Sequence, residues 1–199
     1  MVINGMQKKR YQRNLVKLYN DSTVDNIIHG KLWYKTAHKI CKDLAEKHAV
    51  NFDKVCKIMA VLSPATSWDN NIKSCDRMLH AFMNNTPYGD FTVTTYGQNK
   101  KKAWGILTGY DNLVPTESNL KIWSFYNNIL NPLGKDHVTI DRHAIKVLQG
   151  DIKAGNKSIT PKQYRIAEHV YKEMSTYFGM LPHELQAALW VSYKEKVGR

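Results

Sequence analysis

The residues of this chain that could carry out chemistry centre on one carboxylate, Asp141, which stands immediately before a helical pattern at residues 142–148. The positive end of a helix favours the anionic form of a carboxylate, so we expect Asp141 to stay ionised. An ionised carboxylate can stabilise positive charge that develops on a substrate, and it can orient or deprotonate an attacking water. The same position also suits an ordinary helix N-cap, and this alternative needs no chemistry.

Asp141 belongs to the last of three segments whose order and spacing are informative. The first, IMAVLSPATSW at residues 58–68, predicts a buried helix that ends in a polar turn and leads into another helix. The second, NKKKAWGIL at residues 99–107, predicts a helix with a basic start. The third is VTIDRHA at residues 138–144. Each motif is short, so the information lies in their shared order.

This order resembles the helix–hairpin–helix DNA glycosylase superfamily, the endonuclease-three-like base-excision enzymes. There a buried helix ends in a Leu-Ser-Ala/Pro-type turn, an Asn/Ser-Lys-Ala helix follows, and a Val-Asp-x-His segment bears the catalytic aspartate. The resemblance covers residues 52–148. Together with LSPATSW and VTIDRHA, the terminal LQAALW at residues 185–190 resembles a narrower, largely phage-encoded branch.

The resemblance implies an enzyme that flips a base out of DNA and hydrolyses the bond between base and deoxyribose without a metal or cofactor. Cleavage of that bond builds oxocarbenium-like charge on the sugar, which Asp141 would stabilise. His143 stands at the family's histidine position, where it would contact the DNA backbone or brace the helix. A side chain must fill the space that the flipped base leaves in the stack, and other side chains must line the pocket that receives the base. Two segments supply the candidates for these roles: Thr66, Ser67, Trp68, Gln186 and Trp190.

The residues expected to bind DNA phosphates are basic or hydroxylated: Lys100, Lys101, Lys102, Lys121, Ser124 and Arg142. The lysine block at the start of a helix suits phosphate binding because backbone amides point the same way. A solvated basic face is the alternative for the lysines. For the base-pocket aromatics and the glutamine, the alternative is a role in the core.

The sequence departs from the family at the hairpin, whose glycines normally let backbone amides contact a phosphate. Residues 117–124 read ESNLKIWS without a glycine, so the hairpin is degenerate and side chains such as Lys121 and Ser124 would have to replace the amides. The spacing from Lys121 to Asp141 is two residues longer than that of the lysine nucleophile in bifunctional members. We therefore expect a monofunctional enzyme without lyase activity.

The composition agrees with a DNA partner. The 199 residues include 29 Lys and Arg against 17 Asp and Glu, a formal net charge of +12, and nucleic acid is the commonest anionic partner of such chains. Three cysteines without a Cys-x-x-Cys pair exclude a four-cysteine zinc site and an all-cysteine iron–sulfur cluster within one chain. The sequence has no membrane span or signal peptide, which predicts a cytoplasmic protein, and we expect a monomer.

The hydrophobic period is helical almost throughout, which predicts an all-α protein of about nine helices. Gly30 interrupts an unclear pattern at residues 16–28, after which the helical patterns lie at residues 31–48, 52–62, 67–82, 99–107, 118–130, 138–148, 161–177 and 182 onward. We expect one DNA glycosylase-like domain over residues 1–199, with a core lobe at 52–148, a second lobe from 1–51 and 149–199, and DNA between the lobes.

Two other functions fit the same sequence. Phage relatives of this fold are implicated in the hypermodification of DNA bases, and in such an enzyme the same carboxylate would assist a different substitution. The chain could also be a non-catalytic DNA-binding protein that keeps the fold and lacks the chemistry, an interpretation favoured by the glycine-free hairpin.

Overall fold

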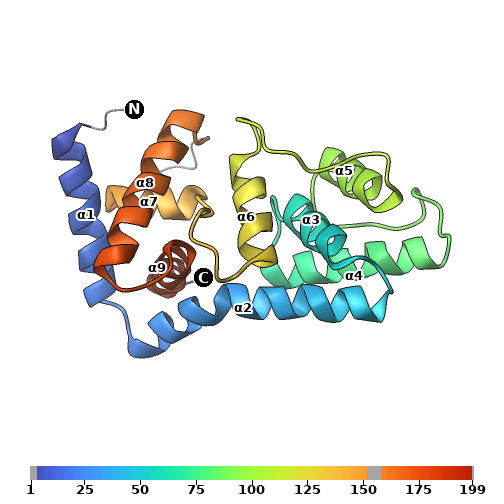
Figure 1. The fold of residues 1–199 in the computed structure, drawn as a ribbon, viewed down its shortest axis with the longest axis horizontal. Helices are drawn as coiled ribbons and strands as arrows, with labels where there is room; N and C mark the ends of the chain where they lie inside the picture. Colours follow the sequence, from blue (N-terminus) through green and yellow to red (C-terminus); the bar gives the residue numbers. More distant parts are fainter. Residues whose placement is uncertain (1–3, 152–157, 199) are drawn as a thin grey trace. The chain divides into compact units, whose positions relative to one another are not determined.

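The computed structural model describes residues 4–151 and 158–198, and this part of the chain consists of nine α-helices without a β-strand. The predicted all-α fold class is therefore confirmed. The helices form two compact units: unit 1 comprises Met1–Thr36 and Asn131–Arg199, and unit 2 comprises Ala37–Leu130. Figure 1 labels the helices in chain order.

Unit 1 is built around α9 (Pro182–Lys196), which contacts α1 (Gly5–Asn20), α7 (Arg142–Gln149) and α8 (Pro161–Tyr177). The first eight residues of α9 are all buried, so this helix has no solvent-facing side over its first two turns. A helix buried on all sides must lie at the centre of its unit. The unit also includes the first half of α2 (Val24–Lys47).

Unit 2 is built around α3 (Phe52–Leu62), which contacts α4 (Trp68–Met83), α5 (Gly97–Thr108) and α6 (Leu120–Leu130). Every residue of α3 from Ile58 to Leu62 is buried, as its continuous apolar sequence predicts. The side chain of Asn51 caps α3, and that of Ser67 caps α4. Such caps satisfy amide donors that the first helical turn leaves without partners.

The units differ in extent from the lobes expected at residues 52–148 and in the remainder. The second half of α2 belongs to unit 2, where Cys41 is fully buried and His38 Nδ1 lies 2.9 Å from the carbonyl oxygen of Ile129. The segment that bears Asp141 belongs instead to unit 1, because α7 packs against α1 and α9.

Three helical expectations need correction. The helix α1 was not expected, because its sequence is mostly polar and only Tyr11 and Leu15 are buried. Gly30 does not interrupt α2, which runs from Val24 through it. Residues 138–140 are extended rather than helical, and α7 begins only at Arg142. Two of these three residues are Val and Ile and the third is Thr, all β-branched types that disfavour helix.

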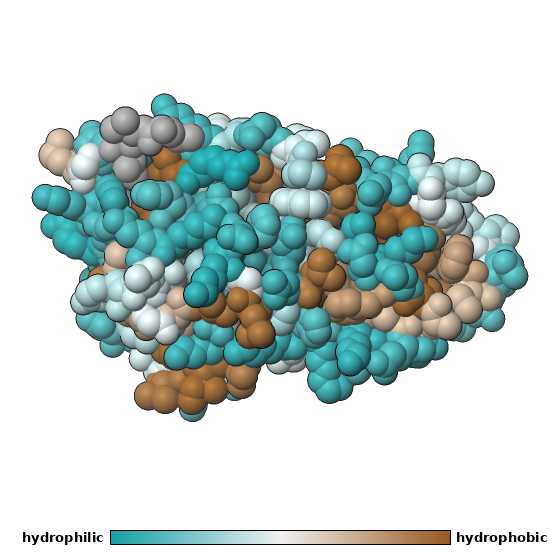
Figure 2. Space-filling view, viewed as in Figure 1, coloured by the Kyte–Doolittle hydropathy of each residue, from teal (hydrophilic) through white to brown (hydrophobic). Residues whose placement is uncertain are grey.

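The start of α2 carries an exposed apolar line at four-residue spacing. Val24, Ile28 and Leu32 are 75%, 47% and 48% exposed. On the face drawn in Figure 2, a hydrophobic area lies at the edge where Figure 1 places the start of α2. None of the helices in the described ranges combines the length and apolar character needed to cross a membrane.

Candidate functional site

Asp141 caps α7 through one carboxylate oxygen, and its second oxygen is available to other partners. Its Oδ1 accepts a hydrogen bond from the backbone N–H of Ala144 at 2.8 Å, and its backbone is extended. The side chain is half-buried. Within residues 4–151 and 158–198, Asp141 forms no ion pair, and Oδ2 has no hydrogen-bond donor. The predicted N-cap is confirmed, and the carboxylate carries a charge that no cation of the described chain pairs with.

Tyr164 on α8 fixes the extended segment that leads into Asp141. Its phenol donates a hydrogen bond to the carbonyl of Val138 at 2.7 Å and accepts one from the N–H of Ile140 at 3.3 Å. The extended segment lies in no sheet, so these two backbone groups would otherwise be buried without partners. Sequence reasoning missed Tyr164, because only its place in the apolar period of α8 marks it.

Replacing Tyr164 with Phe is expected to lower the free energy of unfolding by about 2 kcal/mol, because it leaves a buried carbonyl and a buried N–H unsatisfied. Urea unfolding followed by tryptophan fluorescence measures the loss. Tyr177→Phe is the matched control, since Tyr177 is 72% exposed and should change the free energy little. Equal stability of the two variants would contradict the role of Tyr164.

His143, on the first turn of α7, is buried and only partly satisfied. Its Nδ1 has no hydrogen-bond partner among the described residues, and Arg142 Nε donates to its Nε2 at a long 3.5 Å. Burial lowers the pKa of His143, and the positive charges of Arg142, Lys194 and Lys146 lower it further, although the Asp141 carboxylate acts in the opposite direction. The imidazole is therefore neutral at neutral pH and can accept a proton.

Three histidines of unit 1 make folding sensitive to acid. Burial lowers the pKa values of His137, His143 and His183, so the unfolded chain binds protons below about pH 6.5 that the folded chain does not. Stability is therefore present above pH 6.5 and lost as the pH falls below it, at up to about 1.4 kcal/mol per pH unit for each histidine.

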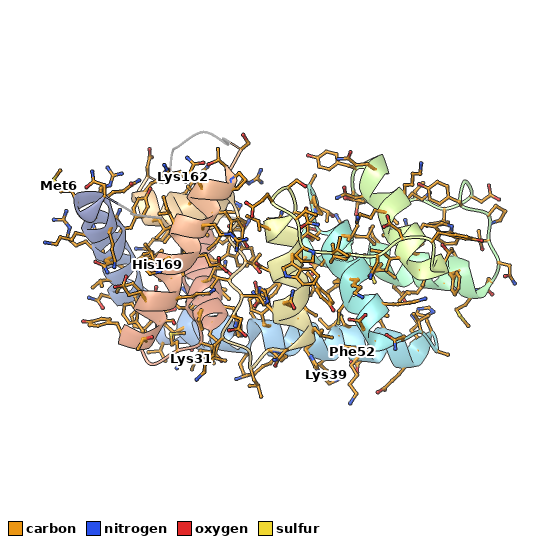
Figure 3. The ribbon with its side chains drawn as sticks, turned by 45° about the horizontal axis from the view of Figure 1, so that its top comes forward. Met6, Lys31, Lys39, Phe52, Lys162 and His169 are labelled. Atoms are coloured by element: carbon orange, nitrogen blue, oxygen red, sulfur yellow. The ribbon has the colours of Figure 1, made fainter. Side chains whose placement is uncertain are left out.

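We expect the urea midpoint to change little between pH 7.5 and about pH 7 and then to fall as the pH is lowered to 5.5, at constant ionic strength. Replacing His169 with Gln provides the control, because this side chain is exposed and labelled on α8 in Figure 3. The urea midpoint of this control should depend on pH in the same way as that of the wild type. A midpoint that does not change over this range would contradict a loss of stability through protonation of these three histidines.

The expected base-pocket residues of α9 lie on one line of the helix, Gln186 and Trp190 at four-residue spacing, with Lys194 one turn further. Gln186 is buried, and its Oε1 accepts a hydrogen bond from the Tyr34 hydroxyl at 3.3 Å. Trp190 is half-buried, its ring lies 6.4 Å from that of Trp33, and the Lys194 ammonium is 5.6 Å from its centroid. The α2 aromatics that hold these residues were missed by sequence reasoning.

The expected plug residues lie in unit 2, in the turn between α3 and α4. Thr66 Oγ1 is 3.1 Å from Thr94 Oγ1, and Ser67 Oγ accepts the N–H of Asn70 at 3.3 Å as the cap of α4. Trp68 is half-buried with its ring 6.2 Å from that of Phe125. Ala65 in the same turn has a φ of 60°, a left-handed conformation that costs a non-glycine residue about 1–2 kcal/mol.

The expected phosphate-binding residues of unit 2 are largely engaged by their own chain. Lys100 Nζ donates to the carbonyls of Tyr88 and Phe91 at 2.8 and 2.5 Å, and it lies over both rings. Lys102 is 3.9 Å from Asp111. Lys101 is exposed.

The two expected phosphate ligands on the degenerate hairpin differ in accessibility. Lys121, near the start of α6, is half-buried and engaged in interactions with its own chain. Ser124 is 3% exposed, so a phosphate could not reach it in this conformation.

The structure therefore gathers one part of the expected site in unit 1. Asp141, Arg142 and His143 share the start of α7, and the ring of His143 packs 5.4 Å from that of Tyr193, one turn beyond Trp190 on α9. Unit 1 has 18 Lys and Arg against 9 Asp and Glu, whereas unit 2 has 11 against 8. Most of the net positive charge thus belongs to the unit that holds Asp141.

The model of a family of unknown function, DUF7178, matches residues 1–197. A search of curated proteins and a search of solved structures found no match.

Proposed function

The chain belongs to the DUF7178 family, whose description assigns no activity, and we propose from the candidate site that it is a DNA glycosylase-like enzyme. The substrate is duplex DNA that carries a modified or damaged base. The reaction is the hydrolysis of the bond between that base and C1′ of deoxyribose, carried out by a monomer in the cytoplasm. This proposal rests on the resemblance of the motif order together with the chemistry that the Asp141 site can perform.

The observation that carries the proposal is the state of the Asp141 carboxylate. It is held by a cap bond through one oxygen, and in the described part of the chain its other oxygen has no donor and no paired cation. Arg142, Lys146 and Lys194 act electrostatically on the neighbouring His143, but none of them forms an ion pair with this carboxylate. A carboxylate left without a paired cation suits a site where positive charge appears only during the reaction.

The neighbouring groups supply the remaining roles. As the C1′–N bond breaks, its electron pair leaves with the base, and the sugar becomes cationic beside Asp141. A water then attacks C1′ and gives up its proton to the carboxylate or to the neutral imidazole of His143, while the departing base takes a proton from solvent. Arg142 is exposed next to Asp141 and can bind a flanking phosphate.

The proposal is tested by incubating the full chain with duplexes that contain uracil, oxidised, alkylated or 5-substituted pyrimidines, followed by hot alkali. Strand breaks at the altered base on at least one substrate are expected. Asp136→Asn is a matched control, because this exposed carboxylate lies five residues before Asp141 and should leave product formation unchanged. Salt-dependent DNA binding without alkali-labile sites on any of these substrates would favour the non-catalytic DNA-binding protein instead.

A further inference from the structure

The helix α1 carries positive charge only. Its sixteen residues include Lys8, Lys9, Arg10, Arg13 and Lys17 and no Asp or Glu. Lys8 is neutralised by Glu173 of α8 at 2.8 Å, and Gln12 donates to the same carboxylate at 3.2 Å. The other four cations are exposed. None of them pairs with a carboxylate within the described ranges.

These four cations share one side of the helix. At 100° per residue, Lys9, Arg13, Lys17 and Arg10 occupy an arc of about 100°. The buried residues Tyr11 and Leu15 lie on the opposite side, where α1 packs against its unit. Met6 falls within the same arc as the cations and is 80% exposed. Figure 3 shows the Met6 side chain directed away from the other helices of unit 1, and Figure 2 shows a mainly hydrophilic surface over α1.

We propose that this arc, the α1 basic face (Lys9, Arg10, Arg13 and Lys17), binds the phosphate backbone of duplex DNA without reading its sequence. The inference rests on the proposed function for its choice of partner. Charge complementarity supports it, because a row of cations without carboxylate partners loses no internal ion pair on meeting phosphates and gains by releasing the counterions of DNA. Lys9 and Lys17 are about 12 Å apart along the helix axis, so the face is long enough to contact more than one phosphate of a strand.

The placement of α1 ties this face to the Asp141 site. Asn14 on α1 donates from Nδ2 to the carbonyl of Leu148 at 2.7 Å, at the end of α7 opposite to Asp141. The helix α7 has eight residues and is therefore about 12 Å long. The lysines of unit 2 that were expected to bind DNA are less available for phosphates, because Lys100 and Lys102 already have partners in their own chain. The α1 basic face is thus the better candidate for holding the duplex.

The test compares Lys9→Gln/Arg13→Gln/Lys17→Gln with a control of equal charge change, Lys39→Gln/Lys42→Gln/Lys73→Gln, whose three lysines are exposed on unit 2. Fluorescence anisotropy with a 20-base-pair duplex is measured over a range of salt concentrations. We expect the α1 variant to lower the slope of log K against log salt by up to about 2.7, and to weaken binding about tenfold or more at moderate salt. The control should keep a slope close to that of the wild type.

Equal slopes for the two triple variants would overturn the proposal, because net charge rather than the α1 face would then govern binding. The proposal would also be overturned if the α1 variant lost binding to single-stranded DNA or to anionic vesicles while its duplex binding stayed unchanged. The readout is separate from catalysis. If the wild type forms no abasic sites but its duplex binding depends on α1, the glycosylase is refuted and the α1 basic face is supported. If the wild type forms abasic sites but the α1 variant keeps the salt slope of the wild type, the α1 basic face is refuted and the glycosylase is supported.

Discussion

Replacing Asp141 with Asn should lower the rate of base release by about 10²- to 10³-fold, the usual effect of removing one preorganised electrostatic group from a transition state. Asparagine caps a helix about as well as aspartate does, so the bond to the N–H of Ala144 can persist. The substitution therefore removes the charge and keeps the fold. Single-turnover kinetics on the substrate cleaved by the wild type measures the effect.

Two measurements accompany that rate. Thermal unfolding should agree between Asp141→Asn and the wild type, and duplex affinity should be equal or slightly higher in the variant because an anion has been removed from a DNA-binding site. If Asp141→Asn released base at the rate of the wild type, the residue would be only the N-cap of α7, and the enzyme would need another catalytic group.

Replacing Gly30 with Ala should destabilise unit 1 by about 3 kcal/mol or more, through overpacking that cannot relax. A Cβ at Gly30 would lie 2.1 Å from Cα and 2.3 Å from the backbone N of Ala188 on α9. Backbone atoms cannot rotate away, so the two helices must separate. Intrinsic helix propensity predicts the opposite sign, a gain of about 1 kcal/mol. Urea unfolding distinguishes these outcomes.

Gly97→Ala is the natural comparison, because a Cβ at this first residue of α5 meets no atom within 4 Å. This variant should be neutral or slightly more stable. Because Ala188 lies between Gln186 and Trp190 in sequence, separation of α2 from α9 should also disturb both side chains. A Gly30→Ala protein as stable as Gly97→Ala would contradict the close helix crossing.

Local chemistry in the sequence was enough to predict most of the fold. Capping side chains at Asn51, Ser67 and Thr160 mark helix starts that the structure contains, and Thr160 adds a full capping box with Gln163. A cap acts within one turn, so neighbouring residues suffice to identify it. The placement of Asp141 before α7 was predictable for the same reason.

Features that depend on distant residues were not predictable. The local sequence predicts that Gly30 breaks a helix. In the structure its missing side chain instead allows the close approach of Ala188, which is more than 150 residues away. The extended form of residues 138–140 depends on the hydroxyl of Tyr164. Lys100 reads as a phosphate ligand until the carbonyls of Tyr88 and Phe91 are seen to surround it. In each case a tertiary contact overrides the local pattern.

The most direct test of the glycosylase proposal is the stoichiometry of its products. With excess wild-type protein and a duplex that it cleaves after alkali, free base and abasic sites should appear in equal amounts by mass spectrometry. The strand should remain unbroken before alkali, and no new group should be attached to the sugar or the base. Duplex that is bound tightly but keeps its altered base, or gains a substituent there, would contradict hydrolysis at the Asp141 site.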